Sequence, residues 1–305
     1  MLDKNIVYLN GDFVPWSQAQ VHMMSHSFGR GSAIFEVMSV HRTDSGSAIF
    51  RLDEHLGRLF HTADILGMEC PLSYESFLEA IRLTVRRNEL QQGAVKVIGF
   101  YPQISFDILP PGKTLDIAVF AFDPAKDHLT QHLSYEKGIT ACVSKWHKLD
   151  PQTVPVEAKA AANYLNGMLA RRDAQARGFD YAVMLDTQGF VAEGGTESVF
   201  LVKDGCLKTP AAGAVLKGIT RKSLLEIAAF LDLESSETRL VPEDLLTADE
   251  IFFSGTPAKV LPVRKMADKT FQEVPGPVTR RLQLLMEGIV TGREERFREW
   301  LFPVD

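Results

Sequence analysis

Lys159 is the residue whose setting in the sequence most directly suggests chemistry. It lies among small apolar residues, from Ala158 to Ala162, where an extended segment or loop gives way to a predicted helix. Removing a lysine from water lowers the pKa of its ammonium group, and the neutral amine forms a Schiff base with a carbonyl compound. A surface lysine near a helix start produces the same pattern, so this residue alone leaves both interpretations open.

Three further segments combine glycine with acidic or hydroxyl side chains. Glu193 precedes two glycines, which permit close approach of the backbone to a flat ligand. Gly218 and Thr220 lie at the predicted start of a helix, where free N–H groups and the helix dipole favour a phosphate. Ser254 to Thr256 form a second hydroxyl-bearing turn. Each segment, taken singly, is also explained by an ordinary turn or helix cap.

Together, the four segments supply an amine for a Schiff base, an acid for a pyridinium nitrogen and two phosphate-binding turns. These are the groups that pyridoxal 5'-phosphate (PLP) requires. The sequence has no Gly-x-Gly-x-x-Gly dinucleotide motif, no Walker phosphate loop and no Gly-x-Ser-x-Gly motif. No carboxylate cluster has the spacing of metal ligands, so we expect no metal.

Two groups of elements are predicted to position these residues. Apolar periodicity in the first part of the chain predicts a small α/β domain over residues 1–122. Its elements are a hairpin within residues 6–15, strands at 33–40, 95–101 and 115–122, and helices at 53–66 and 73–88.

Residues 123–137 are polar and have no clear period, which indicates an interdomain linker. Beyond it we expect a larger C-terminal domain, residues 138–305, that binds the cofactor. Its predicted elements are strands at 139–143, 181–185, 198–202, 250–253 and 260–263, a helix at 160–177, and helices that begin near 220 and 277.

The composition excludes several other classes of protein. The 305 residues include 33 basic and 39 acidic side chains, a net charge of −6 that argues against a nucleic-acid partner. We expect no membrane insertion or export, because no window approaches the roughly 20 uncharged residues of a membrane helix. The three scattered cysteines support neither a disulfide framework nor a zinc site, which is typical of a cytoplasmic protein.

Six segments, in order along nearly the whole chain, resemble the class IV aminotransferases. This family of fold-type IV PLP enzymes includes the branched-chain and D-amino acid aminotransferases and aminodeoxychorismate lyase. The resemblance implies an α+β fold with a small α/β domain, a larger domain with a β-barrel-like core flanked by helices, and a cofactor between the domains. The segments are Asn10–Trp16, Arg51–Leu59, Ala158–Leu165, Glu193–Glu197, Gly218–Arg221 and Ser254–Ala258. Those around Lys159 and Glu193 most resemble the branched-chain group.

The resemblance also implies a role for each matching residue. Lys159 is expected to hold PLP as an internal aldimine and then to move the proton between substrate and cofactor. Glu193 is expected to pair with the pyridine nitrogen. The remaining cofactor-binding residues are Arg58, Ile219, Thr220 and Thr256 for the phosphate, Leu216 against the ring and Tyr164 near the ring hydroxyl.

The residues expected around the substrate depart from the branched-chain pattern. Ala94 and Lys96 replace a tyrosine and an arginine that help to hold the substrate carboxylate, and Val37, after Phe35 and Glu36, replaces a glycine. Arg30 stands where that group has a tyrosine. In the family's Thr-Ala turn, before Ala258, the second position is Pro257, which has no N–H to donate.

We therefore expect leucine, isoleucine and valine to be poor substrates, with Arg30 or Lys96 supplying the charge for a repositioned carboxylate. The alternative is that loops around these positions repack and so compensate for the substitutions in the pocket.

The predicted function is transfer of an amino group between an amino acid or amine donor and a 2-oxo acid by a ping-pong mechanism. An aminodeoxychorismate lyase that eliminates pyruvate, a D-amino acid aminotransferase and a non-catalytic metabolite-binding protein remain as alternatives. The resemblance also implies a homodimer or a higher homo-oligomer, because family members complete each site with a loop of the partner subunit.

Overall fold

The computed structural model describes residues 2–127, 137–213 and 215–304 of the chain. The described residues form two compact units. The first contains residues 2–127, 158–162 and 288–304, and the second contains residues 137–157 and 163–287 without position 214. Most of the predicted linker at 123–137, namely residues 128–136, lies outside the described residues.

The first unit is built on a seven-stranded sheet in which all neighbouring strands are antiparallel. The predicted hairpin is present, and its Asn10-Gly11 turn has φ values of 51° and 103°, which suit asparagine and glycine. The strands, in sheet order, are β16 (Leu301–Pro303), β4 (Gly46–Phe50), β3 (Ile34–Thr43), β5 (Gly93–Phe100), β6 (Asp116–Phe122), β1 (Ile6–Leu9) and β2 (Asp12–Pro15).

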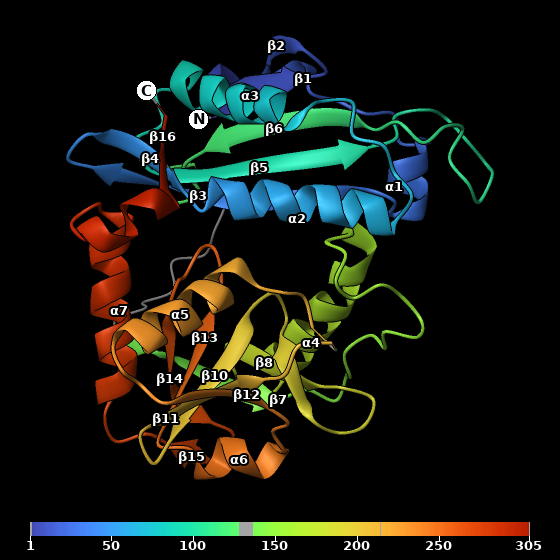
Figure 1. The fold of residues 1–305 in the computed structure, drawn as a ribbon. Helices are drawn as coiled ribbons and strands as arrows, with labels where there is room; N and C mark the ends of the chain where they lie inside the picture. Colours follow the sequence, from blue (N-terminus) through green and yellow to red (C-terminus); the bar gives the residue numbers. More distant parts are fainter. Residues whose placement is uncertain (1, 128–136, 214, 305) are drawn as a thin grey trace. The chain divides into compact units, whose positions relative to one another are not determined.

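Two helices, α2 (Leu52–Ile65) and α3 (Tyr74–Arg87), cover one face of this sheet (Figure 1). Their apolar stripes share one buried cluster with alternate residues of β3, β5 and β6. Gly67, with φ of 65°, ends the first helix, and the Ser73 hydroxyl accepts a hydrogen bond from the N–H of Ser76 at the start of the second. The opposite face of the sheet is therefore free of these helices. A short helix, α1 (His26–Arg30), precedes β3.

The second unit has a nine-stranded sheet whose central strands curl around a single core. Inward-facing residues of β7, β8, β9, β10, β13 and β14 all belong to one buried cluster, and a tight turn joins β9 to β10. This confirms the predicted barrel-like core. The strands are β7 (Ile139–Val143), β8 (Tyr181–Leu185), β9 (Val191–Gly194), β10 (Ser198–Lys203), β11 (Cys206–Pro210), β12 (Ser235–Thr238), β13 (Glu250–Ser254), β14 (Leu261–Met266) and β15 (Lys269–Thr270).

Helices lie outside this barrel-like core (Figure 1). They are α4 (Tyr164–Ala176), α5 (Ile219–Phe230), α6 (Pro242–Thr247) and α7 (Pro277–Val290). Ala170 and Ala174 of α4 pack on Cys142, Ala182 and Met184 of β7 and β8. In the described ranges no helix combines the length and apolar character that a membrane crossing requires.

Candidate active site

Lys159 lies in an extended segment of the first unit. The N–H of Phe35 donates to the carbonyl of Lys159 (3.2 Å), and the N–H of Ala161 donates to the carbonyl of Ala33 (2.8 Å). The Lys159 N–H donates to the hydroxyl of Thr62 on α2 (3.1 Å). The helix predicted at 160–177 begins as a 3-10 turn over Ala161–Asn163 and continues as an α-helix from Tyr164. The backbone of Lys159 is held from two sides by β3 and α2.

Two lysine side chains lie near the ring of Phe35, on the face of the sheet that α2 and α3 leave uncovered. Lys159 Nζ lies 4.8 Å and Lys96 Nζ 5.3 Å from the centre of its ring. Val37 is directly opposite Lys96 across β3 and β5, so it lies on the same face. Burial lowers the pKa of Lys96. The structure thus brings together four of the predicted residues on this face.

Glu36 points to the other face of the sheet and is fully buried against α2. Arg58 donates to both of its oxygens, from Nε at 2.7 Å and from Nη2 at 2.9 Å, and His55 Nδ1 lies 2.7 Å from Oε2. Burial alone raises the pKa of Glu36, but the neighbouring Arg58 and His55 outweigh it and lower the pKa to about 2. Arg58, the predicted phosphate ligand, is thereby fixed in orientation.

Arg30 binds the backbone of the loop that follows β5. Its Nη2 donates to the carbonyl of Phe106 (2.8 Å) and its Nε to that of Asp107 (3.4 Å). The loop also receives a hydrogen bond from the N–H of His26 at the start of α1. Arg30 therefore holds α1 and this loop together.

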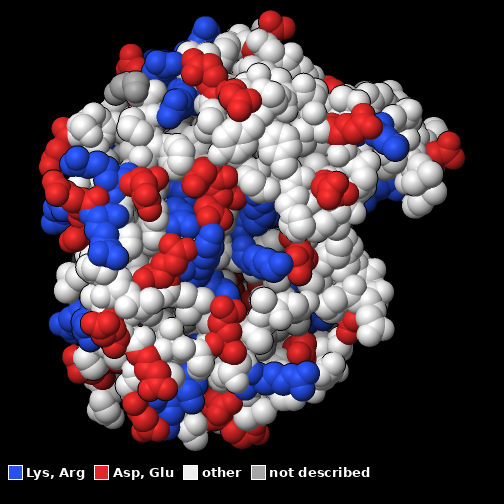
Figure 2. Space-filling view, in the orientation of Figure 1, with Lys and Arg blue, Asp and Glu red and all other residues white. Residues whose placement is uncertain are grey.

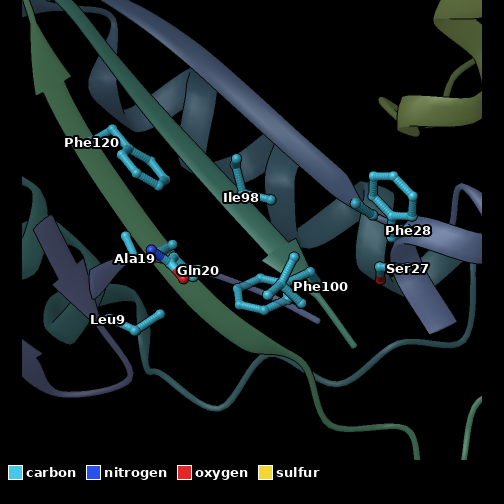
Figure 3. Close-up of a pocket in the computed structure, with 11 residues that line it drawn as sticks. Leu9, Ala19, Gln20, Ser27, Phe28, Ile98, Phe100 and Phe120 are labelled. Carbon is cyan, nitrogen blue, oxygen red and sulfur yellow. The ribbon is translucent and has the colours of Figure 1, made fainter. Parts of the chain in front are cut away.

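A mostly apolar cavity of about 280 Å³ opens on the same sheet face as Lys96. Ile98 and Phe100 of β5 and Phe120 of β6 form its floor, and Ser27 and Phe28 of α1 approach from the side (Figure 3). Ile98 follows Lys96 by two residues, so both side chains lie on one face of the strand.

Glu193 lies at the end of β9 in the second unit and is 7% exposed. Its carboxylate forms an ion pair with Lys148. Gly195, the second glycine after it, packs closely against Gly167 of α4. A Cβ on Gly167 would overlap the carbonyl oxygen of Gly195, so this approach requires glycine. Helix α4 thus fixes the turn that carries Glu193.

The start of α5 lies beside the end of β13. A Cβ on Gly218, the N-cap of α5, would come within 2.8 Å of Ser198 Oγ, and Ser198 is paired directly with Ser254. No side chain caps this helix, and Ile219 and Thr220 are buried in its first turn. The two predicted phosphate-binding turns are therefore neighbours.

A half-buried lysine, Lys259, follows the second of these turns. Gly255 N–H donates to the carbonyl of Ala258 (3.0 Å), and Lys259 Nζ donates to that of Thr256 (3.1 Å). Burial lowers the pKa of Lys259 to about 7. Pro257 is exposed, and Ala258 packs against the core of the barrel.

Tyr164 and Leu216 complete the predicted set. Tyr164 is the first residue of α4, and Leu216 lies two residues before the N-cap of α5; both are half-buried. Both residues belong to the second unit, and Leu216 lies close in sequence to the start of α5.

Sequence reasoning missed Glu36, His55 and Lys148 as partners of the predicted residues. An acid within the apolar strand from Ile34 to Val40 is the signal that could have identified Glu36, because a charge buried in a strand requires a partner. On the face that Figure 2 displays, basic side chains are bordered by acidic ones.

Comparison with known proteins gives one consistent family. The sequence profile described as "Amino-transferase class IV" matches residues 33–266. The branched-chain-amino-acid aminotransferase of Salmonella typhimurium is 36% identical over 302 residues, which are 98% of this chain and 97% of the relative.

Solved structures of two branched-chain amino acid aminotransferases have the same fold. The enzyme from Escherichia coli superimposes with a TM-score of 0.92 at 34% identity, covering 99% of both chains. The enzyme from Thermobaculum terrenum, solved in its PLP form, gives a TM-score of 0.90 at 28% identity over 100% of both chains. This protein belongs to the class IV aminotransferase family.

Proposed function

We propose that this protein is a PLP-dependent aminotransferase that exchanges an amino group between an amino acid or amine and a 2-oxo acid. The observation that carries the proposal is the arrangement in the second unit: the uncapped start of α5 lies beside Ser198 of β10, Ser198 pairs with Ser254 of β13, and a short turn joins β10 to β9, which carries Glu193. The matching Thermobaculum terrenum enzyme was solved in its PLP form, which supports the same ligand here.

The residues of the second unit fit the two polar ends of PLP. At Gly218 a Cβ would lie 2.8 Å from Ser198 Oγ, so glycine lets the backbone at the start of α5 pack directly on β10. The first-turn N–H groups of Ile219 and Thr220 have no acceptor within the helix. Those groups and the Thr256 hydroxyl are suited to bind a phosphate dianion. Glu193, charge-balanced by Lys148, is suited to accept a hydrogen bond from the protonated pyridine nitrogen and so to keep it protonated.

Lys159 supplies the amine in this proposal. Its backbone hydrogen bonds to β3 and α2 fix where the side chain starts, and the aromatic face of Phe35 supports its Nζ. We assign to Nζ the covalent attachment to the aldehyde carbon and, after release, the transfer of the proton at the α-carbon of the substrate. Arg58, oriented by Glu36, is assigned to the phosphate. PLP itself supplies the electron sink that stabilises negative charge on that carbon.

We further propose that the substrate pocket differs from that of the branched-chain enzymes. Lys96 lies beside Phe35 on the same face as the cavity of Figure 3. Arg30 is occupied by two backbone carbonyls, so Lys96 is the better candidate to bind a substrate carboxylate. Pro257 removes one N–H donor and Val37 adds bulk, which disfavours leucine, isoleucine and valine.

The specificity is tested with a panel of donors and 2-oxo acids. Lys96→Met is expected to raise the KM for a dicarboxylic partner about 10- to 100-fold, the contribution of a charged hydrogen bond, while Lys96→Arg retains most of the affinity. Equal activity on leucine and 2-oxoglutarate at the rates of a branched-chain enzyme would refute the altered pocket.

The reaction type is tested by half-reactions of the PLP-loaded protein. An amino donor alone should release one equivalent of 2-oxo acid per site, and a second 2-oxo acid should then restore the starting spectrum. Lys159→Ala should abolish both steps. Release of pyruvate without any acceptor would instead indicate the lyase. Comparison of L and D donors separates the D-amino acid aminotransferase alternative.

A homodimer is also part of the proposal. Segments 25–30 and 103–109 are tied by backbone hydrogen bonds and expose large apolar side chains on the first unit. The most exposed are Phe28, Ile104, Phe106, Ile108 and Leu109, at 58–80%. A patch of this kind is typical of a protein interface, and a second copy of this chain is the occupant we propose.

A further inference from the structure

Two hydroxyl groups in the described part of the chain are buried without a hydrogen-bond partner, those of Ser254 and Thr279. Their residues are only 2% and 1% exposed. A buried hydroxyl left unpaired is destabilising, so native proteins normally satisfy it with a protein group, a water or a ligand. The surroundings of Ser254 indicate which of these it receives.

Ser254 is the last residue of β13 and lies directly opposite Ser198 on β10. Paired residues of antiparallel strands project to the same face. Phe252 precedes Ser254 by two residues, and Phe200 follows Ser198 by two residues. Their rings stack with centres 4.9 Å apart, which confirms that these alternate side chains share one face. The side chains of Ser198 and Ser254 therefore share one face.

That face adjoins the N-terminus of α5. A Cβ on the N-cap residue Gly218 would lie 2.8 Å from Ser198 Oγ, so the helix begins against Ser198, the strand partner of Ser254. The helix has 12 residues and no side-chain cap, and its first-turn N–H groups carry the positive end of the dipole. The unpaired Ser254 hydroxyl and these N–H groups are thus donors that converge on one place.

We propose that Ser254 is a further ligand of the cofactor phosphate, donating its hydroxyl proton to a phosphate oxygen bound at the start of α5. This inference rests on the proposed PLP function and adds to Ile219, Thr220 and Thr256 a fourth residue of the second unit. A phosphate monoester accepts several hydrogen bonds at each of its terminal oxygens, so one more donor is accommodated without displacing the others. The ligand class is therefore a phosphate monoester dianion.

The test compares Ser254→Ala with Thr279→Val in the full chain freed of PLP. Thr279 is the matched control, because it carries the other unpaired buried hydroxyl but lies on α7. Titration with PLP, followed by absorbance, should give a Kd raised about 10- to 100-fold in Ser254→Ala and unchanged in Thr279→Val. Titration with pyridoxal, which lacks the phosphate, should not distinguish Ser254→Ala from wild type.

A second readout separates ligand binding from a structural role. Without PLP, Ser254→Ala should be at least as stable to urea as wild type, because the substitution removes an unpaired buried hydroxyl. Inorganic phosphate should raise the Tm of wild type more than that of Ser254→Ala. Ser254→Cys keeps the size but donates weakly, so its Kd for PLP should be intermediate.

The outcomes distinguish this inference from the function on which it rests. If wild type binds PLP and Ser254→Ala binds it equally well, Ser254 is not a ligand although the function stands. Weaker binding of PLP and pyridoxal alike, with lower stability, would show a structural role and would also overturn the inference. If wild type binds neither PLP nor phosphate, the proposed function itself fails.

Discussion

Replacing the buried carboxylate of Glu36 by an amide should destabilise the first unit by several kcal/mol. Glu36→Gln removes the buried negative charge with which both Arg58 and His55 pair. Loss of one partner from a buried ion pair costs about 3–5 kcal/mol. The fall in pKa from 4.5 to about 2 gives a similar figure, about 3 kcal/mol.

The stabilisation by Glu36 should also depend on pH in a defined direction. Because the pKa is lower in the folded state, the contribution is complete above the unfolded value of 4.5 and is lost as the pH falls through about 2. The difference between wild type and Glu36→Gln, measured by urea unfolding, should therefore fall from about 3 kcal/mol at pH 7 to roughly half of that at pH 3.

The matched control is Glu79→Gln, which makes the same change in the exposed pair with Arg86 and should cost under about 1 kcal/mol. Since Arg58 is assigned to the phosphate, Glu36→Gln should also weaken PLP binding, whereas Glu79→Gln should not. Equal effects of the two substitutions on stability, or a difference that is constant from pH 7 to pH 3, would refute this account of the Glu36 network.

Three further predictions follow from other contacts. Gly167→Ala should destabilise the protein by about 3 kcal/mol, because its Cβ would overlap the Gly195 carbonyl, whereas Gly57→Ala, in open space on α2, should be neutral or stabilising in urea unfolding. The folded state disfavours the protonated form of Lys259, so the free energy of unfolding of the wild type should rise with pH between about 7 and 10.5. Lys259→Met should lack this rise, so its stability relative to the wild type should be higher at pH 6 than at pH 10. Replacing both Phe106 and Ile108 by serine should yield monomers in sedimentation velocity, whereas Leu246→Ser, at an exposed site on α6, should leave the assembly unchanged.

The sequence was sufficient to place most of the secondary structure. Helices near 53–66, 73–88 and 220 and the strand at 139–143 were predicted within a few residues, because apolar periodicity and local caps determine them. The alanines from Ala160 to Ala162 favour a helix locally, yet Ala160 bridges to Ile34 of β3 and the next turn is a 3-10 helix, so the α-helix begins only at Tyr164. Such long-range pairing leaves no local signal.

The candidate site was predictable as residue types but not as contacts. Lys159, Glu193, Thr220 and Thr256 stand out by their neighbours in sequence. By contrast, the Glu36 network depends on the packing of α2 on β3, and the position of Ser254 opposite Ser198 depends on the pairing of β13 with β10. Both are products of tertiary structure, so only coordinates reveal them.

The central claim is that the amine of Lys159 bonds to PLP. Borohydride reduction of the PLP-loaded protein, followed by proteolysis and peptide mass mapping, measures this directly. We predict one phosphopyridoxyl group per chain on the peptide that contains Lys159, with Lys96, Lys148 and Lys259 unmodified. A stable adduct on another lysine, or no adduct after full loading, would contradict the account.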